Sequence, residues 1–214
     1  MSYLTDWLTI LFICSIVIMS PGPNLVITLR NSLIHTQKAG ILTALGLAVG
    51  DLIHIGFWLI GIGWLIARSL WLFNLVKWVG AAYLVYLGIR SLQARGSGKN
   101  PLVEAGTMQR VASPAISPKQ AFRMGLLTCL LNPKVSLFFL ALFTQLIRPN
   151  TPIAVQLFYG ITVASVEFGW FATVAIALSR PWIKRRLLSV AHWVDRVMGV
   201  VLIGLGLRLA LSRE

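Results

Sequence analysis

The stretch Ser-Pro-Gly-Pro-Asn at residues 20–24 lies inside an apolar run that extends from about residue 4 to residue 28. Proline removes a backbone donor from a helix and clashes with the preceding turn, so this stretch predicts an interruption of the helix. The sequence Asn-Pro-Lys at residues 132–134 predicts a second interruption, inside an apolar run over residues 120–147. Each interruption leaves the start of a half-helix, with unpaired N–H groups, in the middle of a hydrophobic segment.

The composition places the whole chain in a membrane. Of its 214 residues, 57% are hydrophobic and 12% are charged, whereas soluble domains carry about 25% charged residues. A helix needs about 20 apolar residues to cross the hydrocarbon layer. Six runs have about this length, at residues 4–28, 40–66, 70–89, 120–147, 152–178 and 192–211. We therefore expect an all-α integral membrane protein with six transmembrane helices, the first and fourth broken, in one domain over residues 1–214.

Positive charge predicts which side of the membrane each loop faces. The 19 Lys and Arg residues exceed the six Asp and Glu residues and give a net charge of +13. They cluster between apolar runs, so nucleic-acid binding is not expected. Lys and Arg are enriched on the cytoplasmic side of membrane proteins. Most of them fall on that side if both termini face outward, and a Gly-, Ser- and Pro-rich linker at about residues 93–119 is then cytoplasmic.

The linker divides the chain into two similar halves. Repeat 1 covers about residues 4–92 and repeat 2 about residues 120–211. Each half has a broken first helix, one acid in its second helix (Asp51 and Glu167) and a third helix that ends in Gly-x-Arg. Three segments per half make the second half enter from the opposite side, so an inverted repeat is predicted. The second helix also has small residues for close helix packing, namely Gly46, Gly50, Gly56, Gly61 and Gly63.

The two breaks predict a binding site. The start of a half-helix presents free N–H groups and a partial positive charge, which suit a carboxylate near the bilayer middle. An ionised group there costs about 2.5 to 3.5 kcal/mol, so Asp51, Glu167 and Lys134 are expected to face the bundle interior or water. Either acid would hold the ammonium of a zwitterion or carry an exchanging proton, while Lys134 would meet an acid or a carboxylate. A purely structural ion pair among the three is the alternative.

His54, one turn after Asp51, is a candidate for proton relay, although packing is the commoner role of such a histidine. No phosphate-binding loop, catalytic triad or ATP site is recognisable. We therefore expect a transporter driven by an ion gradient, with no enzymatic activity, cofactor or metal site. The predicted substrate-binding residues are Pro21, Gly22, Pro23, Asn24, Asp51, Asn132, Pro133 and Lys134, and the predicted proton-coupling residues are Asp51, Glu167 and His54.

Several motifs in order resemble the lysine exporter family of amino-acid efflux proteins, and the resemblance covers nearly the whole chain. They are found at residues 20–24, 46–51, 83–90, 125–134, 137–140 and 204–209. The resemblance implies a multi-pass exporter of amino acids or close derivatives in a bacterial inner membrane, driven by the proton motive force and often dimeric. Its implied partners are an amino-acid substrate, protons, membrane lipid and a second copy of the chain. It assigns roles to the two break motifs and to Asp51, but not to Glu167, and Thr144 stands where relatives often have proline.

Two other functions remain open at this point. A membrane thiol-disulfide relay would use one cysteine per half, and Cys14 and Cys129 meet that count. Such a relay needs both thiols close to the breaks and to each other, and burial as small hydrophobic residues is the simpler interpretation. A divalent metal-ion exporter would need clustered soft ligands, for which Asp51 with His54 is a small set.

Overall fold

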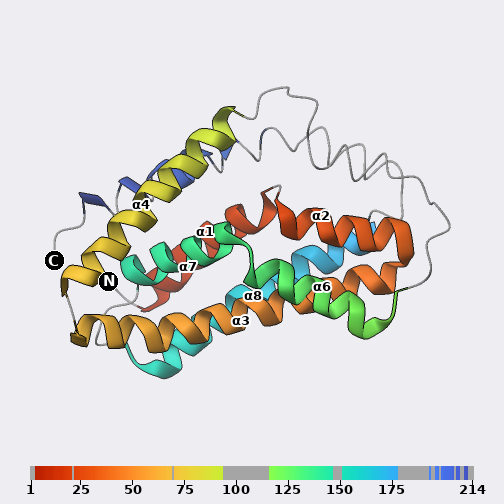
Figure 1. Cartoon of the computed structure of the whole chain (residues 1–214), viewed down its shortest axis with the longest axis horizontal. Helices are drawn as coiled ribbons and strands as arrows, with labels where there is room; N and C mark the ends of the chain where they lie inside the picture. Colours follow the sequence, from red (N-terminus) through yellow and green to blue (C-terminus); the bar gives the residue numbers. More distant parts are fainter. Residues whose placement is uncertain are drawn as a thin grey trace.

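The helices of the protein follow the predicted apolar runs. The computed structural model describes residues 3–20, 22–68, 70–93, 116–146 and 151–177, together with residues 193, 196–197, 199–204, 206–207 and 210–211. Every regular element in these ranges is helical (Figure 1). The elements are α1 (Tyr3–Met19), α2 (Pro23–Arg30), the π-helix η1 (Asn31–His35), α3 (Gln37–Arg68), α4 (Leu70–Gln93), α6 (Pro118–Leu130), α7 (Pro133–Leu146) and α8 (Ile153–Ala177).

Among the described residues, two helices are long and apolar enough to cross a membrane by themselves, at Gln37–Ile60 and Ile153–Ala177. A third span results if the bent segment from Tyr3 to His35 is counted as one. The predicted helical membrane protein is therefore confirmed at this level. Most of the predicted linker, residues 94–115, and much of the sixth predicted segment lie outside the described residues.

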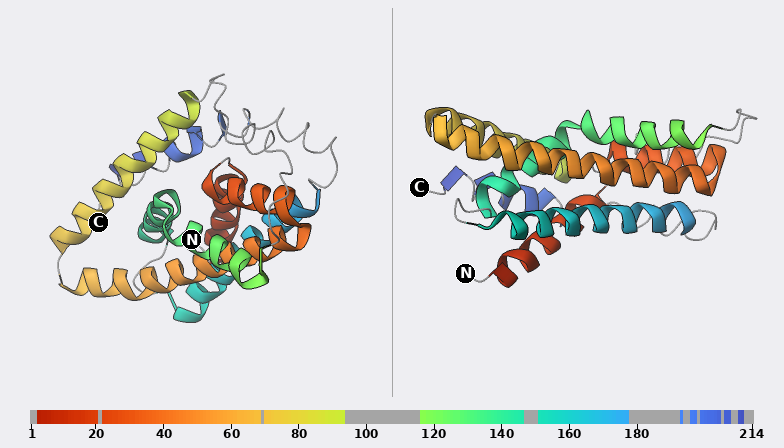
Figure 2. Two further views of the ribbon diagram at one scale, coloured as in Figure 1. Left: turned by 45° about the vertical axis from the view of Figure 1, so that its right-hand side comes forward. Right: turned by 90° about the horizontal axis from the view of Figure 1, so that it is seen from below.

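Both predicted interruptions are present. The chain bends by 57° between α1 and α2, where Gly22 is the extended N-cap residue and Pro23 is the first residue of α2. The second interruption lies at residues 131–132, and α7 then begins at Pro133. Proline is tolerated at the first position of a helix because the N–H group there has no intrahelical partner. The α1–α2 and α6–α7 segments run in opposite directions through the molecule (Figures 1 and 2).

Glycines allow α3 and α6 to pack with their backbones in contact. A Cβ atom added at Gly46 would overlap the backbone oxygen of Phe122, and one added at Gly125 would overlap that of Thr43. A Cβ atom at Gly50 would lie 2.6 Å from Cys129 Cβ. The small face predicted for the second helix is thus confirmed at Gly46 and Gly50. It does not extend to Gly56, where an added Cβ atom would meet no atom of the described residues within 4 Å, so that part of the prediction was wrong.

This contact predicts a difference in stability between two glycine substitutions. Gly125→Ala is expected to lower the free energy of unfolding by about 1–3 kcal/mol, because the added methyl group forces two helix backbones apart. Gly56→Ala is the matched control, since its methyl group meets no atom within 4 Å. Thermal unfolding of both purified variants in detergent checks the difference. Equal melting temperatures would contradict the described packing.

A second glycine contact joins α4 to the last predicted segment. A Cβ atom at Gly88 would lie 2.7 Å from the backbone oxygen of Gly199, and one at Gly199 would lie 2.8 Å from the oxygen of Gly88. The two glycines therefore face each other in a reciprocal contact. Gly88 belongs to the third predicted segment and Gly199 to the sixth, so these two segments pack closely here.

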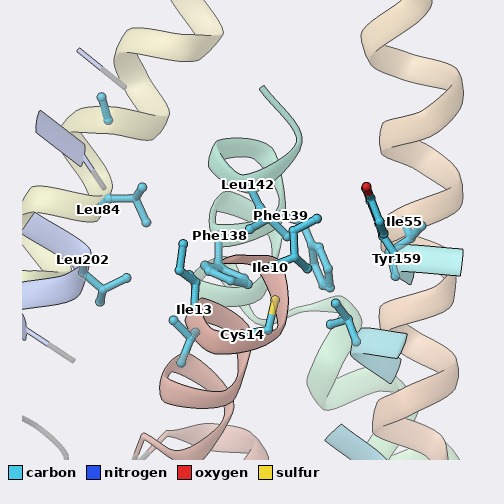
Figure 3. Close-up of a cluster of buried hydrophobic side chains, with 13 residues drawn as sticks. Ile10, Ile13, Cys14, Ile55, Leu84, Phe138, Phe139, Leu142, Tyr159 and Leu202 are labelled. Carbon is cyan, nitrogen blue, oxygen red and sulfur yellow. The ribbon is translucent and has the colours of Figure 1, made fainter. Parts of the chain in front are cut away.

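Apolar packing surrounds the region of the breaks. A cluster of buried side chains unites α1, α7 and α8 with Ile55 of α3 (Figure 3). Figure 3 shows Phe138 and Phe139 of α7 in its centre, beside Ile10 and Ile13 of α1. This cluster fixes α7 next to α1, which brings the two interruptions close together.

Candidate functional site

A chain of hydrogen bonds connects the two interruptions. The backbone N–H of Lys134 donates to Asn132 Oδ1 at 3.1 Å, and Asn132 Nδ2 donates to Asn24 Oδ1 at 3.0 Å. Asn24 Nδ2 then donates to Glu167 Oε1 at 2.9 Å. Both asparagine side chains are buried. The starts of the two half-helices are therefore linked to each other and to the acid of α8.

The two predicted acids lie together in the interior. Asp51 is 2% exposed and Glu167 is 3% exposed. A carboxylate oxygen of each and the sulfur of Cys129 all lie within 4.8 Å of one another, and Cys129 Sγ donates to Asp51 Oδ1 at 3.3 Å. Two buried carboxylates at this separation repel each other strongly when both are ionised. A single positive charge between the two carboxyl groups would relieve this repulsion.

Lys134 places a positive charge at the first interruption. Its Nζ atom donates to Ser20 Oγ. Nζ also lies 3.7 Å from the position that a Cβ atom would take at Gly22. The Lys134 cation therefore sits directly over the gap between α1 and α2.

These polar groups share one cavity. The empty volume of this cavity, including the part that is open to solvent, is about 450 Å³. One part of the lining is polar and comprises Ser20, Gly22, Asn24, Asp51, Asn132, Lys134 and Glu167. The other part is apolar and comprises Val17, Ile18, Val135, Phe138, Phe139, Val163 and Phe171. A site with convergent polar groups and an apolar wall is typical of small-molecule binding.

The cavity contains most, but not all, of the predicted site residues. Pro23 and Pro133 begin the half-helices but do not contribute to the lining, and Pro21 lies outside the described residues. His54 is also absent from the lining. Its Nε2 atom lies 3.3 Å from the backbone oxygen of Cys129, and its ring stacks on Phe139 with centroids 6.1 Å apart. His54 therefore packs against Phe139, a residue of the cavity wall, and does not reach the cavity itself.

Sequence reasoning missed several residues of this site. Ser20 adjoins the first interruption, so its position next to a proline was an available signal. Cys129 was interpreted as a buried small residue or as half of a thiol relay, and its contact with Asp51 was missed because it depends on how α3 and α6 pack. The aromatic wall of Phe138, Phe139 and Phe171 has no distinctive sequence pattern among so many apolar residues.

The Asp51, Cys129 and Glu167 group also bears on metal binding. It offers one sulfur and two carboxylate ligands, whereas the sequence suggested only Asp51 with His54. Mixed sulfur and oxygen ligands do not select one metal clearly. The group therefore leaves the metal-ion alternative open without favouring it.

Known proteins are similar to this chain over most of its length. The family model described as LysE type translocator matches residues 15–213. The threonine efflux protein of Escherichia coli (strain K12) is 27% identical over 97% of this chain and 98% of its own length. The homoserine/homoserine lactone efflux protein of Salmonella typhimurium is 32% identical over 83% of this chain and 84% of its own. An uncharacterized membrane protein of Bacillus subtilis is 30% identical, with 94% and 96% covered. No solved structure matches the chain significantly.

Proposed function

The chain belongs to the LysE type translocator family, and we propose that it exports amino acids or close derivatives across the bacterial inner membrane in exchange for protons. One observation carries the proposal: a single cavity holds a cation, Lys134, and two carboxyl groups, Asp51 and Glu167, beside an apolar wall. A zwitterion with an apolar or weakly polar side chain is complementary to these three parts. The efflux functions named for the threonine and homoserine relatives agree with this class of substrate.

The substrate carboxylate binds at the first interruption. Lys134 Nζ and the Ser20 hydroxyl lie there together, and the first turn of α2 adds unpaired backbone N–H groups. A carboxylate gains charge-assisted hydrogen bonds from all three sources. The substrate ammonium then lies toward Asp51 and Glu167, and its side chain lies against Phe138 and Phe171.

Competition between the ammonium and a proton couples export to the proton gradient. The acid pair needs one positive charge between its carboxyl groups, and a shared proton or the substrate ammonium supplies it. On the cytoplasmic side, ammonium binding displaces the proton. On the outer side, where protons are more abundant, protonation of the pair releases the amino acid. This exchange is proton antiport.

The complete architecture that we propose is six transmembrane helices in two inverted repeats, with both termini outside. Three features support it: the two interrupted segments run in opposite directions, the acids of α3 and α8 meet, and Gly88 contacts its counterpart Gly199. A homodimer in the membrane is part of the same proposal. It rests only on what the resemblance to the lysine exporter family implies.

An accumulation experiment tests the function. Bacteria that express the chain are loaded with a panel of amino acids and dipeptides at toxic concentrations, and growth and intracellular contents are measured. We expect at least one amino acid to accumulate several-fold less than in cells without the chain, and a protonophore to abolish the difference. An unchanged content for every compound would contradict export, and export that persists without a proton gradient would contradict antiport.

The cysteines provide a control against the thiol-relay alternative. Both are free and buried, and they belong to different clusters of the core. Cys14→Ala combined with Cys129→Ser removes both thiols and keeps a hydroxyl donor for Asp51. We expect this double variant to retain export, whereas a relay would lose its function.

A further inference from the structure

A second, apolar cavity adjoins the substrate cavity and shares part of its wall. Phe139 of α7 and Val163 of α8 line both cavities. The empty volume of the second cavity, including its open part, is about 250 Å³. Its remaining lining residues are Ile10, Ile55, Leu142, Tyr159 and Gly160. These two shared side chains therefore form the partition between a polar and an apolar space.

The second cavity leads toward one end of the bundle. Ile10 lies two turns before Val17 on α1, and Tyr159 lies two turns before Glu167 on α8. The direction is therefore toward the end of the molecule where α1 and α8 begin, near the Tyr159 hydroxyl that donates to the Tyr3 oxygen at 2.9 Å. In the other direction the glycine contact holds α3 and α6 backbone to backbone, and no residue of α6 lines either cavity.

The position of Phe139 is connected to Asp51 through two residues. The ring of His54 stacks on Phe139 with 25° between their planes. His54 Nε2 contacts the backbone oxygen of Cys129 at 3.3 Å, and the thiol of Cys129 donates to Asp51. A movement of Asp51 toward a bound ligand would first weaken its contact with Cys129, then the contact of Cys129 with His54, and last the stacking of His54 on Phe139.

We propose that Phe139, together with Val163, is the gate between the substrate cavity and an exit chamber, and that His54 is the positioning residue that keeps this gate closed. Removal of Asp51 from its contact with Cys129 loosens His54 and frees the Phe139 ring to turn. The inference rests on the proposed function for the direction of passage. The gate itself is a physical barrier and can be tested without transport.

The test measures access of a thiol reagent to the substrate cavity. Val135 lines that cavity and not the exit chamber, so Val135→Cys is made in the Cys14→Ala, Cys129→Ser background. A membrane-impermeant methanethiosulfonate is added to vesicles of each orientation, and an N-terminal tag marks the side where α1 begins. We expect Phe139→Ala to raise the labelling rate from that side by about ten-fold, because the reaction requires access to the thiol.

Phe138→Ala is the matched control. Phe138 is the neighbouring buried phenylalanine on α7, and it lines the substrate cavity alone. It should leave the labelling rate within about two-fold of the background, since it does not open the partition. Equal rates for the two variants, or an increase only from the opposite side, would overturn the gate.

If Phe139→Ala does not fold, a second pair of variants that lose less packing provides the same test. Val163→Ala opens the same partition with a smaller loss of packing, and labelling should rise by about three-fold. Val174→Ala is its control, because Val174 is equally buried on α8 but lines neither cavity. No difference between the two valine variants would count against the gate.

The positioning role of His54 has its own readout. His54→Ala should speed labelling of Val135→Cys by about five-fold, whereas His54→Phe, which keeps a ring against Phe139, should restore slow labelling. Slow labelling in His54→Ala would refute the role of His54. If no amino acid is exported but these rates change as expected, only the proposed function fails; if export is present and the rates do not change, only the gate fails.

Discussion

Asp51→Asn is expected to reduce proton-driven efflux by about 100-fold, the largest loss from any single substitution in the chain. The change keeps the size of the side chain but removes the negative charge that, in the proposed mechanism, the substrate ammonium and the exchanging proton share. A hydrogen bond to a charged group contributes about 1.5–3 kcal/mol, which corresponds to about 10- to 150-fold in affinity, and loss of coupling adds to it. Initial efflux rates from preloaded cells, normalised to the amount of protein in the membrane, provide the measurement.

The control for this prediction is Asp6→Asn. Asp6 is an acid of α1 that is also largely buried, but it does not line the substrate cavity. Its substitution should leave the efflux rate within about two-fold of the original, as expected for a residue distant from the site. If Asp51→Asn transports normally while present in the membrane, the assignment of the acid pair to coupling fails.

Lys134→Gln is expected to weaken transport by about 10- to 100-fold, chiefly as a higher substrate concentration for half-maximal efflux. Glutamine retains a donor for Ser20 but lacks the charge that attracts the carboxylate in the proposed binding mode. Lys119→Gln is the matched control, since Lys119 is exposed in the first turn of α6, outside the cavity. Efflux rates measured over a range of substrate concentrations distinguish Lys134→Gln from Lys119→Gln. An unchanged half-maximal concentration in Lys134→Gln would place the carboxylate elsewhere.

Proline made the interruptions predictable from sequence. Pro23 and Pro133 both begin a half-helix, a position where the missing N–H group costs no intrahelical hydrogen bond. The acids were predictable for a related reason, because a charge in a membrane helix has to face the interior. Asp51 and Glu167 accordingly lie in one cavity with the breaks.

Contacts that depend on the register between helices could not be predicted in the same way. The bond from Cys129 to Asp51 requires Gly50 to lie against Cys129, and nothing in either segment alone specifies that partner. His54 shows the same limit. Its spacing from Asp51 suggested proton relay, whereas its described neighbours are the ring of Phe139 and a backbone oxygen of α6.

The amide chain at the breaks has a polarity, and that polarity determines which atoms of Asn132, Asn24 and Glu167 face one another. A backbone N–H, that of Lys134, can only donate, so Asn132 must present its oxygen to it and its nitrogen to Asn24. Asn24 must in turn present its nitrogen to Glu167 Oε1, which therefore acts as an acceptor. The other carboxyl oxygen of Glu167 takes no part in this chain. One peptide group at the start of α7 thus orients the acid of α8 through two asparagine side chains.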